Sequence, residues 1–538
     1  MYFRFIKLHL LMTKQLILIS FFGLSMFAFA QKSETEGPEN LNWYLKDPKK
    51  DGVYGTGATK AYEMLNAAGK KSTTIIVAVI DSGVETDHPD LKDVIWVNED
   101  EIPNNGIDDD KNGYVDDIHG WSFLGGATED IDKEAMELAR MYRIESAYFS
   151  DKKAQDIPSN ELARFATYEK IKIAFEKEIA EKQQSLTNIK ALSDYMGRVE
   201  AQTGATFSKE TNNAYVPASE TDTKIQKRMN AILLLLPAEQ LNTEIASALE
   251  SVESDLRMAT QNADSIRTAI VGDNPNDLSS KIYGCNRYEG PDAFHGTHVS
   301  GIIAATRGNG MGIDGVADNV RIMVVRAVPD GDERDKDVAN AIIYAVDNGA
   351  KVINMSFGKY WTPNKEYVDA AIEYARSKDV LLVHAAGNDA KDKDVEDSYP
   401  TRRLNNRTNA PNWIEVGASS SAKSGKKIIA NFSNYGATSV DFFAPGVDIY
   451  STVPDYNYGN ASGTSMACPA TAGVAALIRS YFPELSAAEV REVLMATTAT
   501  YKKTVVAPNG EKAKMKDLCI TGGFVNAANA VAYLLEKK

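Results

Sequence analysis

The chain has 538 residues, of which 43% are hydrophobic and 25% are charged. It is therefore long enough for more than one hydrophobic core and too apolar for a disordered protein. A formal net charge of −15 excludes the extended basic surface that a nucleic-acid-binding protein needs in order to neutralise phosphates. This charge is compatible with a soluble protein outside the cytoplasm, but it names no activity.

The N-terminus has the pattern of a secretory signal peptide. Three basic residues precede an apolar run, Leu16–Ala30, which ends in an Ala-Phe-Ala sequence. The alternative is a membrane anchor, but a run of about fifteen residues is shorter than the ~20 that span a bilayer. We expect cleavage after Ala30, a secreted or periplasmic protein, and no membrane span in the mature chain.

Strand-like and helix-like segments alternate along much of the remaining chain. Residues 31–72 form an N-terminal segment, and the β-branched run Thr73–Ile80 then predicts a buried strand of a parallel sheet. Further strands are predicted at Arg321–Val328, Ala350–Met355, Val380–His384 and Trp413–Ala418. Helices are predicted at Val338–Asn348, Val368–Ser377, Cys468–Tyr481 and Ala487–Thr497. This alternation is typical of a doubly wound α/β domain.

Residues 126–284 interrupt this pattern. Their apolar residues recur at steps of three and four, as in Ile245, Leu249, Val252 and Leu256, with charged residues between them. We expect a mostly α-helical insertion, a long hairpin or a small bundle, with a structural or regulatory role. The α/β domain would then comprise residues 73–125 and 285–538.

Three motifs carry the residues of a hydrolytic site. Asp81 lies in Val-Ile-Asp-Ser-Gly, His295 opens His-Gly-Thr-His-Val-Ser-Gly, and Ser465 lies in Gly-Thr-Ser-Met-Ala-Cys-Pro. A serine hydroxyl is a weak nucleophile that needs an imidazole to take its proton, and the imidazole needs a carboxylate to fix its tautomer. Taken singly, each residue has an ordinary alternative as a turn, structural or helix-capping residue. Their joint occurrence at strand ends and helix starts predicts that they assemble at one end of the sheet.

In the order Asp, His, Ser, these motifs resemble the subtilisin family, the subtilases. The resemblance covers residues 73–124 and 285–500 and includes the spacers Asp-His-Pro-Asp-Leu at 87–91, Val-Ile-Asn-Met-Ser at 352–356 and Ala-Pro-Gly at 444–446. One departure is the distance of over two hundred positions between Asp81 and His295, for which the insertion accounts. The resemblance implies a subtilisin-like fold and a serine endopeptidase that acts on polypeptides without an organic cofactor.

The resemblance also implies roles for individual residues. Asp81 would orient His295, which would act first as general base and then as general acid, while Ser465 attacks the scissile carbonyl carbon. Asn388 matches the asparagine that donates its amide to the oxyanion, beside the Ser465 backbone N–H. A plain turn residue is the alternative for Asn388, but the strand before it and Asp389 after it favour the oxyanion role.

Substrate recognition follows from the same resemblance. The segment that resembles a substrate-pairing edge consists of Ser356, Phe357 and Gly358. The segment that would form one wall of the pocket for the side chain preceding the scissile bond consists of Ala385, Ala386 and Gly387. Asp389 and the acidic residues at 330–333 indicate a preference for basic or polar side chains, and solvated loop charges are an equally good interpretation.

Two places resemble calcium sites. Asp90 matches a calcium-ligating aspartate of many subtilisins, and Asn309 lies in a loop like the one that completes that site. A second run resembles the start of an EF-hand loop, with the candidate ligands Asp108, Asp110, Asn112 and Asp116. The glutamate expected at its twelfth position is His119 here. Oxygen ligands suit Ca²⁺ better than zinc, so we expect structural calcium.

Two other functions are compatible with these residues. One is a catalytically silent scaffold that binds a partner through the helical insertion, although no triad residue is missing. The other is a maturation protease of narrow specificity. We expect a monomer. With three cysteines, at least one thiol must stay unpaired. The sequence does not decide whether Cys285 and Cys519 form a disulfide.

Overall fold

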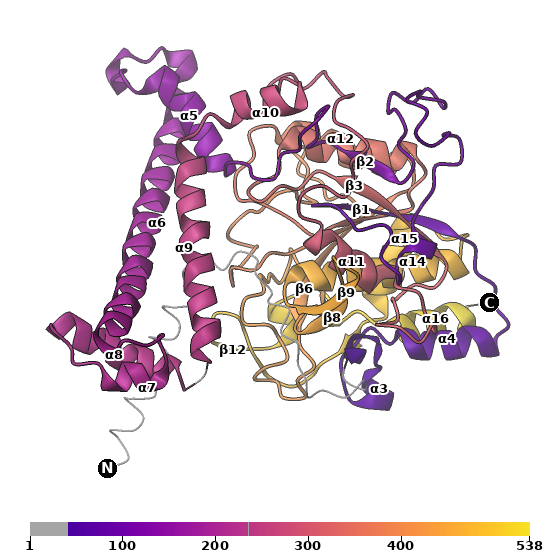
Figure 1. Ribbon diagram of the computed structural model, residues 1–538. Coiled ribbons are helices and arrows are strands. Elements are labelled where there is room, and N and C mark those ends of the chain that lie inside the picture. The colour runs from indigo at the N-terminus through magenta and orange to yellow at the C-terminus, as the bar shows by residue number, and fades with distance from the viewer. Residues whose placement is uncertain (1–40, 235, 538) are drawn as a thin grey trace. The chain divides into compact units, whose positions relative to one another are not determined.

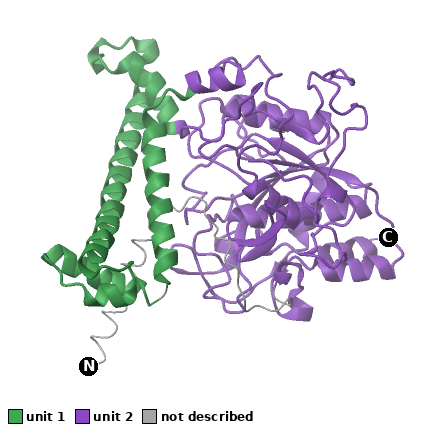
Figure 2. Ribbon diagram, in the orientation of Figure 1, with its two compact units in different colours: residues 1–27, 138–263 green, residues 28–137, 264–538 purple. Residues whose placement is uncertain are grey.

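The computed structural model describes residues 41–234 and 236–537. The signal peptide predicted at residues 1–30 lies outside this range. In the described residues no helix is long and apolar enough to cross a membrane. Among them, the chain divides into unit 1, which comprises residues 138–263, and unit 2, which comprises residues 41–137 and 264–537 (Figure 2).

Unit 2 is built around a sheet that has nine strands in the described part of the chain, in the order β10-β13-β7-β6-β5-β4-β1-β3-β2 (Figure 1). The central strands are β1 (Ile75–Asp81), β3 (Val320–Arg326), β4 (Val352–Met355), β5 (Leu381–Ala385), β6 (Trp413–Ser419) and β7 (Phe442–Pro445). The edges are formed by β2 (Gly120–Ser122), β13 (Gly523–Phe524) and β10 (Ala499–Thr500). Neighbouring strands are parallel, except for the β10–β13 pair.

Side chains of β1 alternate between two hydrophobic cores, one on each face of the sheet. Val77 and Val79 belong to one core, and Ala78 and Ile80 belong to the other. The helices of the first face include α11 (Phe294–Ala304), α14 (Thr464–Tyr481), α15 (Ala487–Ala496) and α16 (Ala527–Glu536). Those of the second face include α12 (Asp335–Asp347) and α13 (Lys365–Ser377). Burial on both faces explains the continuous apolar runs, and it confirms the predicted α/β class.

The N-terminal segment is part of this core. It contains the 3₁₀ turn Trp43–Leu45 and the helices α3 (Pro48–Asp51) and α4 (Ala58–Ala67). Helix α4 packs against α16, and Leu65 is completely buried. The buried Tyr44 hydroxyl donates a hydrogen bond to the Asp314 carbonyl oxygen at 2.5 Å. Helices α4 and α16, which lie near opposite ends of the described chain, therefore stabilise each other.

Unit 1 is helical, as predicted for the insertion. Its helices are α5, which begins at the boundary (Glu137–Phe149), α6 (Leu162–Thr203), α7 (Lys209–Ala214), α8 (Glu220–Ile232) and α9 (Ala238–Thr260). Helices α6 and α9 lie side by side as a long hairpin (Figure 1). One small core, which includes Tyr195, Val199 and Met229, lies where α6 meets α7 and α8.

The segments that lead into and out of unit 1 belong to unit 2. Asp330 pairs with the incoming segment, because its N–H donates to the Asp132 carbonyl oxygen at 2.8 Å and its carbonyl oxygen accepts from the Glu134 N–H at 2.9 Å. The outgoing segment contains α10 (Ala263–Val271). Arg267 of α10 is completely buried and forms ion pairs with Asp273 at 2.9 Å and Asp337 at 2.7 Å. Residues 126–137 and 264–284 thus pack with the catalytic α/β unit.

The three cysteines are free thiols. Cys468 is buried in α14, and its Sγ donates to the Val383 carbonyl oxygen at 3.2 Å. Cys285 and Cys519, for which the sequence left a bridge open, do not form one in this structure.

Replacing Leu65 by Ala tests whether the N-terminal segment supports the fold. Loss of this buried side chain leaves a cavity against α16, so the free energy of unfolding should fall by about 2–5 kcal/mol. Urea unfolding in a Ser465→Ala background, which avoids self-digestion, measures the effect. Asn66→Ala changes an exposed neighbour in the same helix and should alter the free energy by less than about 0.5 kcal/mol. Equal unfolding midpoints for the two variants would contradict this role.

Candidate active site

Asp81 and His295 come together from distant parts of the chain. Asp81 is the last residue of β1, and His295 lies in the first turn of α11. His295 Nδ1 lies 2.7 Å from Asp81 Oδ1. Their approach depends on Gly296, because a Cβ there would lie 2.0 Å from the Gly83 carbonyl oxygen. Burial disfavours the charged imidazolium, but the charge of Asp81 and its hydrogen bond outweigh burial and raise the pKa of His295 above its ordinary value.

Ser465 lies in the first turn of α14, a helix in which every residue is buried. Its hydroxyl donates to the Ser356 carbonyl oxygen at 3.2 Å, and the Ser356 hydroxyl donates to the Ser465 carbonyl oxygen at 2.9 Å. His295 Nε2 is buried and has no hydrogen-bond partner in the described chain. The predicted triad residues are therefore a formed Asp81–His295 pair and a serine whose hydroxyl points to the segment after β4.

Asn388 follows β5 and contacts the start of α14. Its Oδ1 accepts hydrogen bonds from the Thr464 N–H at 2.8 Å and the Thr464 hydroxyl at 2.9 Å. These two donors define which end of the amide is oxygen, so Nδ2 is the free end. A Cβ built on Gly463 would lie 3.6 Å from Asn388 Nδ2 and 3.5 Å from the Ser465 N atom. Two N–H donors thus flank one point beside the serine.

The predicted edge segment leads to a backbone bridge at Lys359, and its Gly358 is exposed. The Lys359 N–H donates to the Tyr399 carbonyl oxygen at 2.9 Å, and the Tyr399 N–H donates to the Lys359 carbonyl oxygen at 2.8 Å. Alternate residues of an extended strand turn their backbone groups to opposite sides, so the exposed Gly358 turns its groups away from Tyr399.

The predicted wall segment continues β5 toward the serine. Ala385 and Ala386 are buried, and the Ala386 N–H donates to the Val416 carbonyl oxygen at 2.9 Å. The Gly387 N–H donates to the Thr464 hydroxyl at 3.1 Å. The edge and wall segments therefore contact the start of α14 through different residues.

A tyrosine joins the segments that follow β4 and β5. The Tyr360 hydroxyl donates to Asp389 Oδ2, and Lys391 Nζ lies 3.7 Å from the centre of the Tyr360 ring. Asp332 is also engaged, because its buried carboxylate accepts from the Glu137 N–H at 2.7 Å. These contacts occupy Asp389 and Asp332, two of the acidic groups that the sequence associated with basic substrates.

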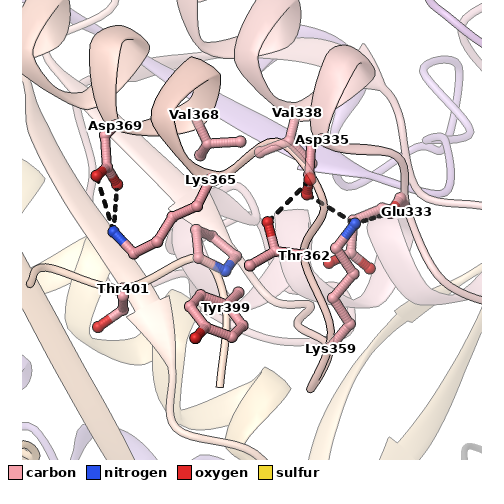
Figure 3. A pocket seen from close by; sticks show the side chains of 11 residues that line it. Glu333, Asp335, Val338, Lys359, Thr362, Lys365, Val368, Asp369, Tyr399 and Thr401 are labelled. Atoms are coloured by element: carbon pink, nitrogen blue, oxygen red, sulfur yellow. Dashed lines mark hydrogen bonds and ion pairs between the residues drawn. The ribbon is translucent and has the colours of Figure 1, made fainter. Parts of the chain in front are cut away.

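A charged pocket lies beyond the edge segment (Figure 3). Lys359 Nζ contacts Glu137 Oε2 at 2.7 Å and Asp335 Oδ1 at 2.8 Å. Lys365 Nζ contacts Asp369 Oδ1 at 2.7 Å. Because each lysine is matched by a carboxylate, the pocket presents paired charges.

Asp90 and Asn309 lie together and are hydrogen-bonded to each other. The Asp90 carboxylate accepts from Asn309 Nδ2 at 2.6 Å and from the Tyr458 hydroxyl at 3.3 Å. Asn309 Oδ1 accepts from the Met311 N–H at 2.9 Å, which fixes the orientation of the amide. Hydrogen-bond donors therefore face the Asp90 carboxylate in this structure, and a calcium-binding role of Asp90 and Asn309 stays a prediction.

The acidic loop brings three carboxylates together. One oxygen from each of Glu101, Asp110 and Asp117 lies within 4.8 Å of the other two. Burial raises the pKa of Asp117 to about 6, although hydrogen bonds from Tyr344 and from two asparagines oppose this rise. An oxygen-only set with a costly buried charge fits a hard cation such as Ca²⁺.

The other predicted ligands of this loop form hydrogen bonds within the loop. Asp108 accepts from the N–H groups of Asn112 and Gly113 at 3.1 and 2.9 Å. Asp116 accepts from the N–H groups of Asn105 and Gly106 at 3.1 and 2.9 Å. The Asn112 amide donates to Asp110 at 3.0 Å.

Sequence analysis therefore identified one residue of the carboxylate cluster, Asp110, and missed Glu101 and Asp117. Glu101 precedes the regular Asp-x-Asp-x-Asn pattern in the sequence. Its side chain is held against this loop because Oε1 accepts hydrogen bonds from the N–H groups of Asp109 and Asp110 at 2.9 and 3.2 Å. The spacing of residues in a calcium-binding loop motif gives no signal for this contact.

Comparison with known proteins agrees with the motifs. A thermophilic serine proteinase from Bacillus sp. (strain AK1) is 39% identical over 247 residues, which cover 44% of this chain and 52% of that protein. Thermitase from Thermoactinomyces vulgaris is 36% identical over 222 residues, which cover 40% of this chain and 73% of that enzyme. The match to the first relative thus spans about half of its length.

A solved structure of a protease from Pseudoalteromonas arctica PAMC 21717 is 32% identical, with a TM-score of 0.37, over 44% of this chain and 70% of that chain. The model of the subtilase family matches residues 72–515, which is most of the sequence. The chain therefore belongs to the subtilase family of serine endopeptidases.

Proposed function

We propose that this protein is a secreted endopeptidase that hydrolyses peptide bonds through Asp81, His295 and Ser465. The observation that carries the proposal is the 2.7 Å contact between Asp81 and His295 in a unit where Ser465 begins a buried helix. The Asp81 carboxylate accepts a hydrogen bond from Nδ1–H, so the proton stays on Nδ1 and the neutral ring keeps a lone pair on Nε2 for the serine proton.

The reaction begins with rotation of the Ser465 hydroxyl from the Ser356 carbonyl oxygen to His295 Nε2. The serine oxygen attacks the carbonyl carbon of the scissile bond while His295 takes the proton, and Asp81 stabilises the imidazolium. Asn388 Nδ2 and the Ser465 N–H donate to the oxyanion. His295 then protonates the leaving amine, which leaves an acyl-enzyme. Water, deprotonated by His295, attacks the acyl carbon. The ester bond to Ser465 then breaks, His295 returns the proton to the serine oxygen, and the acid product leaves.

The substrate binds as an added strand. Gly358 turns its backbone groups away from Tyr399, so an extended peptide can pair with this side of the edge segment. Unfolded chains and loops are the polypeptides that can adopt this conformation.

Asn388→Ala tests the oxyanion site. Loss of one donor to the oxyanion should lower kcat by about 10²–10³ and leave KM nearly unchanged, because the interaction forms only in the transition state. Steady-state hydrolysis of a fluorogenic peptide measures both constants, with Ser465→Ala as the inactive reference. Ser462→Ala, which removes a nearby exposed hydroxyl, is the control and should keep normal turnover. A normal kcat for Asn388→Ala would sink the assignment.

The pH profile tests the Asp81–His295 pair. His295 must be neutral to act as base, so kcat/KM falls as pH decreases through its pKa, and this acid limb should lie above the ordinary value of about 6.5. Asp81→Asn should move the limb to lower pH and reduce kcat by about 10⁴. Asp292→Asn removes a weaker and exposed negative charge, so its shift should be smaller and its kcat near normal. Identical profiles for the two variants would contradict the pairing.

Calcium belongs to the same proposal. We expect Glu101, Asp110 and Asp117 to hold Ca²⁺, which would neutralise three adjacent carboxylates and fix the loop before β2. This role is structural and takes no part in the chemical steps.

Thermal unfolding of the Ser465→Ala protein should show a Tm that rises with added Ca²⁺, since a ligand that binds only the folded state stabilises it. Asp110→Asn should remove most of this rise. Asp100→Asn, an exposed acid in the same loop, is the control and should retain it. A calcium response that is equal in both variants would place the ion elsewhere.

A further inference from the structure

A buried histidine lies at the end of β5, immediately before the wall segment. His384 is only 1% exposed. Its Nδ1 lies 3.1 Å from Glu415 Oε1 on the neighbouring strand β6. Its Nε2 is buried and has no hydrogen-bond partner among the residues that the structure describes. A buried ring nitrogen without a partner is costly unless a ligand completes it.

The free nitrogen lies next to the edge segment. A Cβ built on Gly358 would lie 3.5 Å from His384 Nε2 and 3.2 Å from the Tyr399 carbonyl oxygen. The ring centres of Phe357 and Trp413 lie 6.4 and 5.1 Å from that of His384. His384 Nε2 therefore lies beside the edge segment, on the strand that leads into the wall segment.

The surroundings of His384 determine its tautomer. The Glu415 carboxylate also accepts from Lys393 Nζ at 2.6 Å and from Trp413 Nε1 at 2.8 Å. Burial opposes ionisation of Glu415, but Lys393 and His384 lower its pKa to about 2. An ionised Glu415 requires a proton on Nδ1 of His384. On a ring that carries its proton at Nδ1, Nε2 is a hydrogen-bond acceptor.

We propose that His384 Nε2 is the floor of the pocket for the side chain preceding the scissile bond, and that it selects neutral side chains that donate a hydrogen bond. This inference rests on the proposed function, because it uses the edge and wall segments as the substrate site. Asparagine and threonine are the kind of side chain that satisfies the acceptor. His384 is a specificity-determining residue here, since it would touch the substrate without entering the reaction.

Electrostatics exclude the other classes of side chain. A cationic side chain would find no unpaired carboxylate behind the ring, because Glu415 is already paired with Lys393, whose ammonium also donates to the Ser398 hydroxyl. An anionic side chain would meet a lone pair and, behind it, the ionised Glu415. An apolar side chain would leave Nε2 buried and unpaired, which costs more than the hydrogen bond itself is worth. The Tyr360–Asp389 contact supports this selection, because it engages the one acid beside Asn388.

Pairs of peptides that differ in shape as little as possible test the proposal. Extended fluorogenic peptides carry Asn or its apolar isostere Leu, and Thr or its isostere Val, before the scissile bond. We expect kcat/KM to be roughly tenfold higher for the donor of each pair, the effect of one hydrogen bond. His384→Phe keeps a ring against Trp413 but has no acceptor, so the preference should disappear or reverse.

Gly358→Ala is a second variant, which does not depend on tolerance of the buried network. Its new Cβ would lie between the pocket and Nε2, so it should also abolish the preference for the donor of each pair. Equal rates for Asn and Leu in the unaltered enzyme, or an unchanged ratio in folded His384→Phe and in Gly358→Ala, would overturn the inference.

Fluorophosphonate labelling of each protein separates this failure from failure of the proposed function. Enzyme that is labelled at Ser465 but shows no preference for the donor contradicts the His384 assignment alone. Unaltered enzyme that is folded but not labelled contradicts the proposed function, and the His384 assignment with it.

Discussion

The constraint on which this structure depends is that parallel neighbouring strands end at the same edge of a sheet. Strands β1, β4 and β5 are adjacent and parallel, and each has a residue of the proposed site at its end or within three residues of it. Asp81 ends β1, Ser356 follows β4, and Asn388 lies a few residues beyond β5. Two buried helices begin at this edge and bring His295 and Ser465 to it. A rigid sheet therefore holds the residues of the proposed site together at the ends of its strands and the starts of its helices.

Buried charges explain how a long insertion can interrupt such a unit without disturbing it. Arg267 is held by Asp273 and Asp337, and Lys336 contacts the same Asp273 at 2.8 Å. Removing one partner of a buried pair costs about 3–5 kcal/mol, so the segment after the insertion has a well-defined place in unit 2. The segment before the insertion pairs with the backbone of Asp330, a few residues before α12 begins. The insertion thus begins and ends in ordered parts of the catalytic unit.

The sequence predicted the parts of the fold that long, regular patterns specify. Strands β1 and β3 to β6 were recognisable because β-branched runs are buried on both faces, and their observed ends differ from the prediction by only one or two residues. Helix α14 begins at Thr464, four residues before the predicted start, because Ser465 already lies in its first turn. Strands β10 and β13 have two residues each, which is too short for any periodic pattern.

The site was predictable where a motif is continuous in sequence and not where folding creates it. The contact between Asp81 and His295 agrees with the motifs, although their catalytic roles stay predictions. Glu101 and His384 could not be found in this way. The position of each depends on contacts that form only on folding. Glu101 contacts the backbone of the acidic loop, and His384 contacts Glu415 on the next strand.

The most direct test of this account is labelling of the purified protein with a fluorophosphonate, followed by mass spectrometry of the labelled peptide. The account predicts one adduct, on Ser465, whose formation slows as His295 becomes protonated at low pH. A folded, calcium-supplied protein that forms no adduct, or that forms it on another serine, would contradict the account.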